Sequence, residues 1–180
     1  VSESMYQAPY NKGVFGDRLG IIYNTIIQHS KTYGMFKHLI IGNLGDSIDG
    51  LNGLTTRGGH VLPQNMDIKE VFNTYVSHHA GFLTGLLKEN VCENLYYVAV
   101  SDTNHGGDIE YICHKSLQYM MMNTPVKFDI MTNFMEHFII GNNCFIFTHG
   151  KDKTDRKRNM PLVLNDNVEN FIKQYIDING

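Results

Sequence analysis

The stretch 39-LIIGNLGDSIDG-50 joins an apolar run to an acidic turn bracketed by glycines. The run 37-KHLIIGNL-44 predicts a short buried strand, because it is apolar, brief and followed by glycine. Asp46 and Asp49 come directly after that strand, three residues apart. Carboxylates in this position are more often turn or helix-capping residues than metal ligands. The stretch alone therefore leaves two interpretations open, an ordinary polar turn and a metal-ligand turn.

Helix and strand patterns alternate on both sides of this stretch. Upstream, apolar residues at helical spacing predict a helix over 17–31 with Asp17 as its N-cap. The elements predicted downstream are a long loop over 51–66, a helix over 67–88 capped by Asp67, a strand over 95–101, a helix over 109–122, strands over 126–131, 136–141 and 143–149, and a helix over 166–178. These patterns place Ile22, Ile112 and Met120 on inward helix faces. The alternation predicts an α/β fold of layered mixed β-sheets flanked by helices.

The composition describes a globular chain without a strong bias in charge. With 180 residues, of which 42% are hydrophobic, the chain is expected to form one domain with a core. The net charge of −3 gives no global reason to expect binding to nucleic acid. The basic run 151-KDKTDRKR-158 is interpreted as a solvated loop, with a local basic patch as the alternative. Cys92, Cys113 and Cys144 lack paired spacing and are expected to be reduced thiols in or near the core of a cytoplasmic protein. No apolar run approaches a membrane span, so no membrane partner is expected.

Polar clusters follow three of the predicted strands. Asp46 follows the first, Asn104 and His105 lie in the turn 101-SDTNHGGD-108, and His149 ends the run 145-FIFTHGKD-152. Each cluster alone is most often just a loop or a structural histidine. Together they deliver a carboxylate, a carboxamide and two imidazoles to the edge at which open α/β sheets build their sites. Oxygen and imidazole ligands suit Mn, Fe or Zn, so the sequence predicts a site for one or two divalent metal ions.

In this order and at these positions, the clusters resemble the motifs of the calcineurin-like metallophosphoesterases. The hexapeptide 45-GDSIDG-50 is similar to that family's GDxxDG motif, the Asn-His pair to its GNH motif, and 147-FTHG-150 to its later histidine motif. The wider stretch 43-NLGDSIDGLNGLTTRGGHVLPQNMD-67, with THGKDK downstream, looks most similar to phage- and prophage-borne members. The resemblance spans most of the chain.

The resemblance implies an α/β/β/α sandwich that hydrolyses a phosphomonoester or phosphodiester by means of a metal-bound hydroxide. Nucleotides and nucleic acids are among the substrates that it admits. Asp46 would bridge two metal ions, and Asn104 and His149 would bind the second of them. His105 would lie outside the metal ligands and donate a proton or hydrogen bond to the phosphate or the leaving oxygen.

The loop over 51–66 and the start of the chain complete this expected site. Arg57 and His60 would contact a substrate phosphate from the loop. Glu3 and Met5 stand where the family has Asp-x-His. Glu3 could still bind a metal through oxygen, whereas the soft thioether of Met5 is a poor substitute for an imidazole.

The family's closing histidine pair has no counterpart, because no histidine follows residue 149, and His137 is a candidate to complete the second metal site. A second function therefore stays open, a catalytically degenerate phosphoesterase fold that serves as a binding or structural module. A third interpretation is that the remaining ligands lie outside these residues or come from a neighbouring chain. The sequence indicates neither the substrate nor the oligomeric state.

Overall fold

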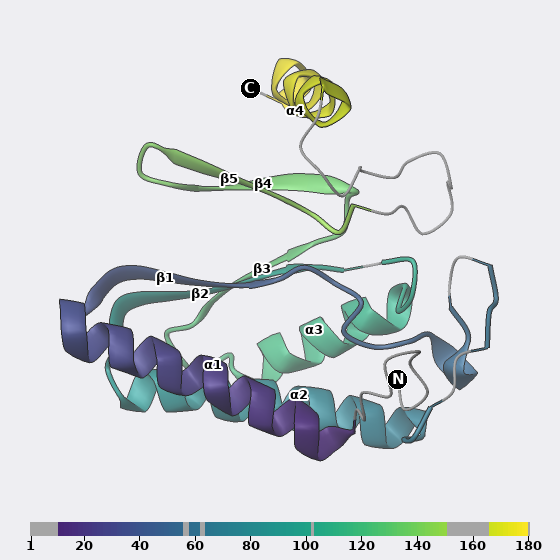
Figure 1. Ribbon diagram of the computed structural model, residues 1–180, viewed down its shortest axis with the longest axis horizontal. Helices are drawn as coiled ribbons and strands as arrows, with labels where there is room; N and C mark the ends of the chain where they lie inside the picture. Colours follow the sequence, from purple (N-terminus) through teal and green to yellow (C-terminus); the bar gives the residue numbers. More distant parts are fainter. Residues whose placement is uncertain (1–10, 56–57, 62–63, 102, 151–165, 180) are drawn as a thin grey trace.

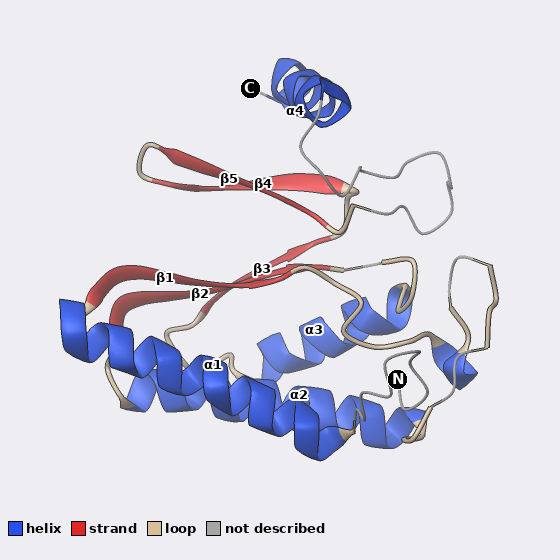
Figure 2. Cartoon of the chain, viewed as in Figure 1, coloured by secondary structure: helices blue, strands red, loops and turns tan. Residues whose placement is uncertain are grey.

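A computed structural model describes residues 11–55, 58–61, 64–101, 103–150 and 166–179. In this part of the chain the fold is mixed α/β, with a three-stranded parallel sheet, a two-stranded antiparallel sheet and four α-helices (Figure 1, Figure 2). The elements in chain order are α1 (Lys12–Tyr33), β1 (Phe36–Asn43), the 3-10 turn η1 (Leu51–Gly53), α2 (Ile68–Lys88), β2 (Cys92–Val100), α3 (Asp108–Met120), β3 (Lys127–Met131), β4 (Met135–Ile140), β5 (Asn143–Thr148) and α4 (Asp166–Asn179). None of the described helices is long and apolar enough to cross a membrane.

The parallel sheet has the order β1-β2-β3, and its register brings the carboxyl ends of β1 and β2 together. Asn43, the last residue of β1, is paired with Ala99, next to the end of β2. Val100 is paired in turn with Met131 at the end of β3. The turn that follows β1 and the turn that follows β2 consequently leave the sheet at the same edge. This is the arrangement that the alternation of strands and helices predicted.

The elements are stacked in layers around the parallel sheet. Helices α1, α2 and α3 lie on one face of it, the β4–β5 hairpin lies over the other face, and α4 lies beyond the hairpin (Figure 1). The hairpin contacts the sheet through the rings of Phe138 and Tyr96, whose centroids are 5.2 Å apart. Helix α4 is attached to the hairpin by a hydrogen bond of 2.9 Å between His137 Nδ1 and the hydroxyl of Tyr175.

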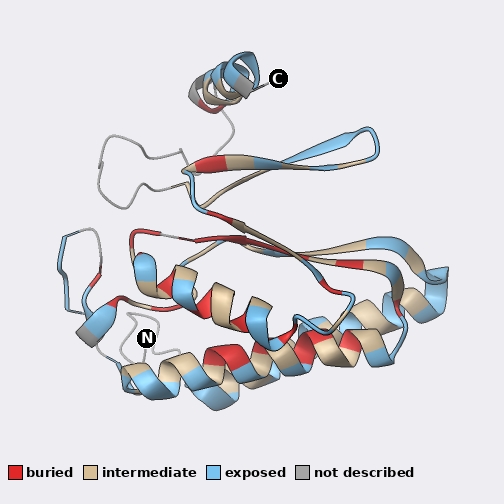
Figure 3. Cartoon of the chain, turned by 180° about the vertical axis from the view of Figure 1, so that it is seen from behind, coloured by how far each residue is buried: buried red, intermediate tan, exposed pale blue. Residues whose placement is uncertain are grey.

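The main core lies between the parallel sheet and the helices (Figure 3). Its buried members are Phe82, Leu83, Leu86, Val91, Leu95, Tyr97, Ala99, Leu117, Met121 and Val126. Each fully buried apolar side chain of this size contributes roughly 1.5–3 kcal/mol through its removal from water. A second cluster joins Ile48, in the acidic turn after β1, to Tyr75 and Val76 of α2 and Cys113 of α3. The turn after β1 is therefore packed onto the two helices beneath it.

Helices α1 and α2 each begin directly after a residue whose side chain caps them. The prediction that Asp67 caps α2 is confirmed, because its carboxylate accepts the backbone N–H of Glu70 and the Glu70 side chain accepts the backbone N–H of Asp67. The prediction that Asp17 caps the first helix is wrong. The carboxamide oxygen of Asn11 accepts from the backbone N–H groups of Gly13 and Val14, so α1 begins at Lys12.

Some side chains predicted to face inward do not. Ile22, Ile112 and Met120 are 52%, 49% and 61% exposed. Cys144 is exposed as well, whereas Cys113 is buried and Cys92 is half-buried. On α3 the inward face is occupied partly by polar side chains, and this explains why an apolar periodicity misjudged it.

Candidate metal site at the strand ends

The turn after β1 presents Asp46 in an unusual backbone conformation. Asp46 has a φ of 54°, and the preceding Gly45 has a φ of 89°. A left-handed conformation costs a residue with a Cβ about 1–2 kcal/mol, so neighbouring bonds must hold it. Asn43 provides two of them, because its side-chain oxygen accepts from Gly45 N at 3.0 Å and from Ser47 Oγ at 2.9 Å. The conformation points the Asp46 carboxylate away from the core.

Asp46 meets the two other predicted ligands at the edge of the sheet. Nε2 of His149 lies 3.2 Å from Asp46 Oδ1 and 2.9 Å from Asn104 Oδ1. The three side chains come from the ends of β5, β1 and β2, far apart in the sequence. On the other side of the His149 ring, Nδ1 donates to the backbone oxygen of Leu44 at 2.9 Å. That bond fixes the ring so that Nε2 faces the two oxygens.

The charges of this group depend on one another. The hydrogen bond to Asp46 raises the pKa of His149 above its usual value, against the opposing effect of burial. Burial acts to raise the pKa of Asp46, but the hydrogen bond and charge of His149, together with the charge of His105, outweigh it and lower that pKa. Because both ring nitrogens of His149 face oxygen acceptors, the ring is stabilised in its doubly protonated form when no cation is bound.

These side chains fit a divalent cation. Two ligands at right angles, each about 2.1 Å from a metal, lie about 3 Å apart, close to the 2.9 and 3.2 Å separations from His149 Nε2. A hydrogen bond from the far ring nitrogen to a carbonyl oxygen, as His149 makes to Leu44, is how metal-binding histidines are commonly oriented. The third donor is the carboxamide of Asn104. Counting only His, Cys, Asp and Glu, the described residues contain no group of three or more side chains that could hold a metal ion.

His105 stands beside this trio in an orientation fixed by a second carboxylate. Its Nδ1 lies 2.8 Å from Asp49 Oδ1, and its Nε2 lies 3.9 Å from Asp46 Oδ2. The other oxygen of Asp49 accepts a hydrogen bond from the side chain of Gln64, in the loop before α2. Because a carboxylate oxygen accepts hydrogen bonds, the Nδ1 that faces it is the donor, and Nε2 is turned toward Asp46. About a third of the His105 side chain is exposed, so a solute can reach it.

Several groups that support the site were not predicted from the sequence. The Asn43 side chain donates to the hydroxyls of Tyr75 at 3.1 Å and Tyr97 at 3.2 Å, and Tyr75 is bonded in turn to His114 Nδ1 at 2.8 Å. Glu110, fully buried, bonds to both strand-end turns. The signal that could have found His114 and Glu110 is a polar residue at an inward position of an otherwise apolar helix face.

The other predicted site residues are Glu3, Arg57, His60 and His137. Glu3 and Arg57 lie outside the described residues. His60 is exposed. Its backbone oxygen accepts from Thr55 N–H and its backbone N–H donates to Thr55 Oγ1, and the side chains that hold Asp46 do not include it. Nδ1 of His137, the candidate to complete the second metal site, is bonded to the hydroxyl of Tyr175 of α4 at 2.9 Å.

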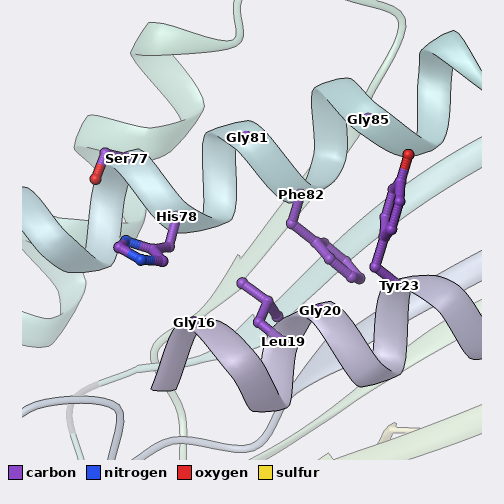
Figure 4. Close-up of a pocket in the computed structure, with 9 residues that line it drawn as sticks. All are labelled: Gly16, Leu19, Gly20, Tyr23, Ser77, His78, Gly81, Phe82 and Gly85. Carbon is purple, nitrogen blue, oxygen red and sulfur yellow. The ribbon is translucent and has the colours of Figure 1, made fainter. Parts of the chain in front are cut away.

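Among the cavities in the described part of the chain, two border the helices. One of about 290 Å³ adjoins Asp49 and is lined by Asp49, Gly50, Gly53, Gln64, Asp67, Ile68 and Val71. A larger one of about 450 Å³ lies between α1 and α2, where Leu19, Tyr23 and Phe82 approach glycines of both helices (Figure 4). Its walls are mostly apolar and carry no carboxylate or basic side chain other than His78, so it lacks the groups that bind a metal or a phosphate.

Comparison of the chain with models of protein families, with curated proteins and with solved structures returned no match. The resemblance to calcineurin-like metallophosphoesterases rests on the motifs at the ends of β1, β2 and β5. In the structure those motifs supply Asp46, Asn104 and His149, and Nε2 of His149 lies within hydrogen-bonding distance of both Asp46 and Asn104.

Proposed function

We propose that this chain is a metal-dependent phosphoesterase of the calcineurin-like type, acting on a phosphomonoester or phosphodiester. The observation that carries the proposal is the convergence of Asp46, Asn104 and His149, with Nε2 of His105 turned toward Asp46. The order of the layers, from helices through the parallel sheet and the hairpin to α4, is compatible with the α/β/β/α sandwich of that family (Figure 1).

In this proposal the trio holds a divalent ion such as Mn, Fe or Zn. When bound, the ion would lower the pKa of a coordinated water and neutralise charge on the phosphoryl oxygens. Asp46 and Asn104 offer hard oxygen donors, and His149 offers Nε2 once that nitrogen has released its proton. Asp46 and Asp49 give the site a negative character, so an anionic ester is attracted to it only with cations present.

His105 is the candidate proton donor to the leaving oxygen. The bond from Nδ1 to Asp49 fixes the orientation of the ring and keeps Nε2 directed toward Asp46. Proton transfer by a positioned side chain contributes typically 10²- to 10⁴-fold to a rate, by order of magnitude. Arg57 and His60 remain predicted contacts to the phosphate, and nucleotides or nucleic acid remain the substrate classes that the resemblance suggests.

A second candidate function is that of a non-hydrolytic binding module built on the same fold. The observation in its favour is Met5, at a position where the family has an imidazole. Such a protein would bind one ion through Asp46, Asn104 and His149 without turnover.

The two candidates differ in hydrolysis of aryl phosphates in the presence of Mn²⁺. The phosphoesterase is expected to release nitrophenol from mono- or bis-nitrophenyl phosphate, with loss of activity in Asp46→Asn and a fall of roughly 10²- to 10⁴-fold in His105→Ala. His29→Ala, which removes an exposed imidazole on α1, serves as the control and is expected to retain the wild-type rate. Wild-type rates in both site variants would contradict the proposal, and Mn²⁺ binding without any turnover would favour the binding module.

A further inference from the structure

Glu110 is a fully buried carboxyl group in the first turn of α3. Burial raises its pKa, and two hydrogen bonds act in the opposite direction. Oε1 accepts the backbone N–H of Ser47 at 2.7 Å, and Oε2 accepts the hydroxyl of Thr103 at 2.6 Å. A carboxyl group is costly to bury, so these two bonds are what makes the position tolerable.

The two partners of Glu110 belong to the two turns that carry metal-site side chains. Ser47 follows Asp46 directly, and Thr103 precedes Asn104 directly. Asp46 has a positive φ, so the orientation of its carboxylate depends on what holds the next peptide group. Glu110 holds that peptide group through Ser47 N–H and, with its second oxygen, the start of the Asn104 turn.

Close packing keeps Glu110 in this position. A Cβ added to Gly106 would come within 2.7 Å of Glu110 Cβ and 3.0 Å of the backbone oxygen of Ile48. The turn after β2 is therefore pressed against both Glu110 and the turn after β1. In this arrangement the Glu110 carboxyl has little room to shift away from its two partners.

We infer that Glu110 is a positioning residue that fixes Asp46 relative to Asn104 and thereby sets the affinity of the site for a divalent cation. This inference rests on the proposed metal site. The two hydrogen bonds of Glu110 reach the peptide of Ser47 and the hydroxyl of Thr103 and none of the three candidate ligands. Glu110 also interacts electrostatically with Asp46 and His149, so the test must separate position from charge. Removal of such supporting partners in metal proteins typically weakens metal binding by about 10- to 100-fold.

The test compares Mn²⁺ dissociation constants, measured by calorimetry, for the wild type and three variants. Glu110→Ala removes both bonds and is expected to weaken binding by about 10- to 100-fold. Glu110→Gln preserves the shape, since its carboxamide oxygen can accept from Ser47 N–H and its NH₂ can donate to Thr103, and is expected to bind Mn²⁺ nearly as well as the wild type. Leu117→Ala, at a fully buried position of the same helix, lowers stability without touching either turn and is expected to leave the affinity unchanged.

The outcomes separate this inference from the proposed function. Wild-type protein that binds no Mn²⁺ would overturn the metal site and this inference with it. If the wild type and Glu110→Ala bind Mn²⁺ equally well, the metal site stands and only the positioning role of Glu110 is overturned. Equal weakening in Leu117→Ala would overturn it too, because the effect would then be general destabilisation. If Glu110→Gln weakens Mn²⁺ binding as much as Glu110→Ala does, the charge of Glu110 is responsible and the positioning role is overturned.

A second readout needs no metal. In the metal-free protein the amide of Ser47 is expected to exchange with solvent hydrogen slowly in the wild type and in Glu110→Gln, and faster in Glu110→Ala. Equal exchange in all three would contradict the contact. Should Glu110→Ala not fold, Thr103→Val removes the bond between Thr103 and Glu110, together with the contacts of the same hydroxyl to Gly106 N–H and to Asp46. It is expected to weaken Mn²⁺ binding by at least about tenfold, the lower end of the usual range. An unchanged affinity in that variant would overturn the inference.

Discussion

Acid is expected to destabilise the fold through one buried imidazole, His114 of α3. The side chain is fully buried, and its Nδ1 is bonded to the hydroxyl of Tyr75 at 2.8 Å. Its Nε2 has no hydrogen-bond partner within the described residues. Burial, with a smaller effect from His79, lowers the pKa of His114 from 6.5 to about 3. The ring is therefore neutral in the folded protein at pH values where it would be charged in water.

The magnitude follows from the two pKa values of His114. Because the pKa in the folded state is the lower one, the unfolded state binds the proton first as the pH falls. Stability is therefore complete above pH 6.5 and is lost below it, down to about pH 3. Each pH unit in this window costs about 1.4 kcal/mol, so the loss at pH 5 is about 2 kcal/mol from this residue.

The assay is urea unfolding over a series of pH values from neutral to about 5. His114→Asn keeps an acceptor near the Nδ1 position and cannot titrate, so its stability is expected to fall with acid less steeply than that of the wild type by about 1.4 kcal/mol per pH unit. His29→Ala, at an exposed position, is the control and is expected to keep the wild-type slope. Parallel slopes for the wild type and His114→Asn would refute the reasoning.

Three further results are expected. Gly45→Ala should destabilise the fold by about 2–4 kcal/mol in thermal or urea unfolding, because the φ of Gly45 is 89° and the new Cβ would lie 2.3 Å from Thr103 Cγ2. Gly20→Ala should instead stabilise the fold by up to about 1 kcal/mol, because Gly20 lies inside α1 and its new Cβ would meet open space. Equal effects of the two alanines would contradict this. Asp67→Ala should lower stability by about 1 kcal/mol through loss of the α2 capping box, and an unchanged urea midpoint would argue against it. Because a neighbouring carboxylate raises the pKa of His149, calorimetric Mn²⁺ affinity should fall by up to about tenfold per pH unit below that pKa, and a pH-independent affinity would contradict this.

Much of the fold could be predicted because it is specified by local patterns. Apolar runs and helical spacing identified the strands and helices, and the Asp67 capping signal identified the start of α2. The rule that parallel strands end at one edge of a sheet then predicted that residues as distant as Asp46 and Asn104 would be neighbours. His149 was expected at the same edge, but it reaches that edge from β5 of the separate antiparallel hairpin, so the rule for parallel strands does not account for its position.

The remainder depended on contacts that no local pattern contains. Glu110 and His114 are polar residues on an inward helix face, tolerated only because distant partners satisfy them. Their burial turned the apolar side chains of Ile112 and Met120 outward. The sequence predicts Asn43 near a strand end. That its side chain links the acidic turn to the hydroxyls of Tyr75 and Tyr97 could not be predicted, because this contact depends on where α2 and β2 lie.

The central claim is that Asp46, Asn104 and His149 bind a divalent cation. The most direct measurement is a titration with Mn²⁺, with bound metal counted by elemental mass spectrometry, on the wild type, Asp46→Asn and Asp129→Asn. Asp129 is a half-buried carboxylate of β3 outside the trio and serves as the matched control. Binding by the wild type and Asp129→Asn that is lost in Asp46→Asn is the predicted result. No binding by the wild type, or equal binding by all three proteins, would contradict the claim.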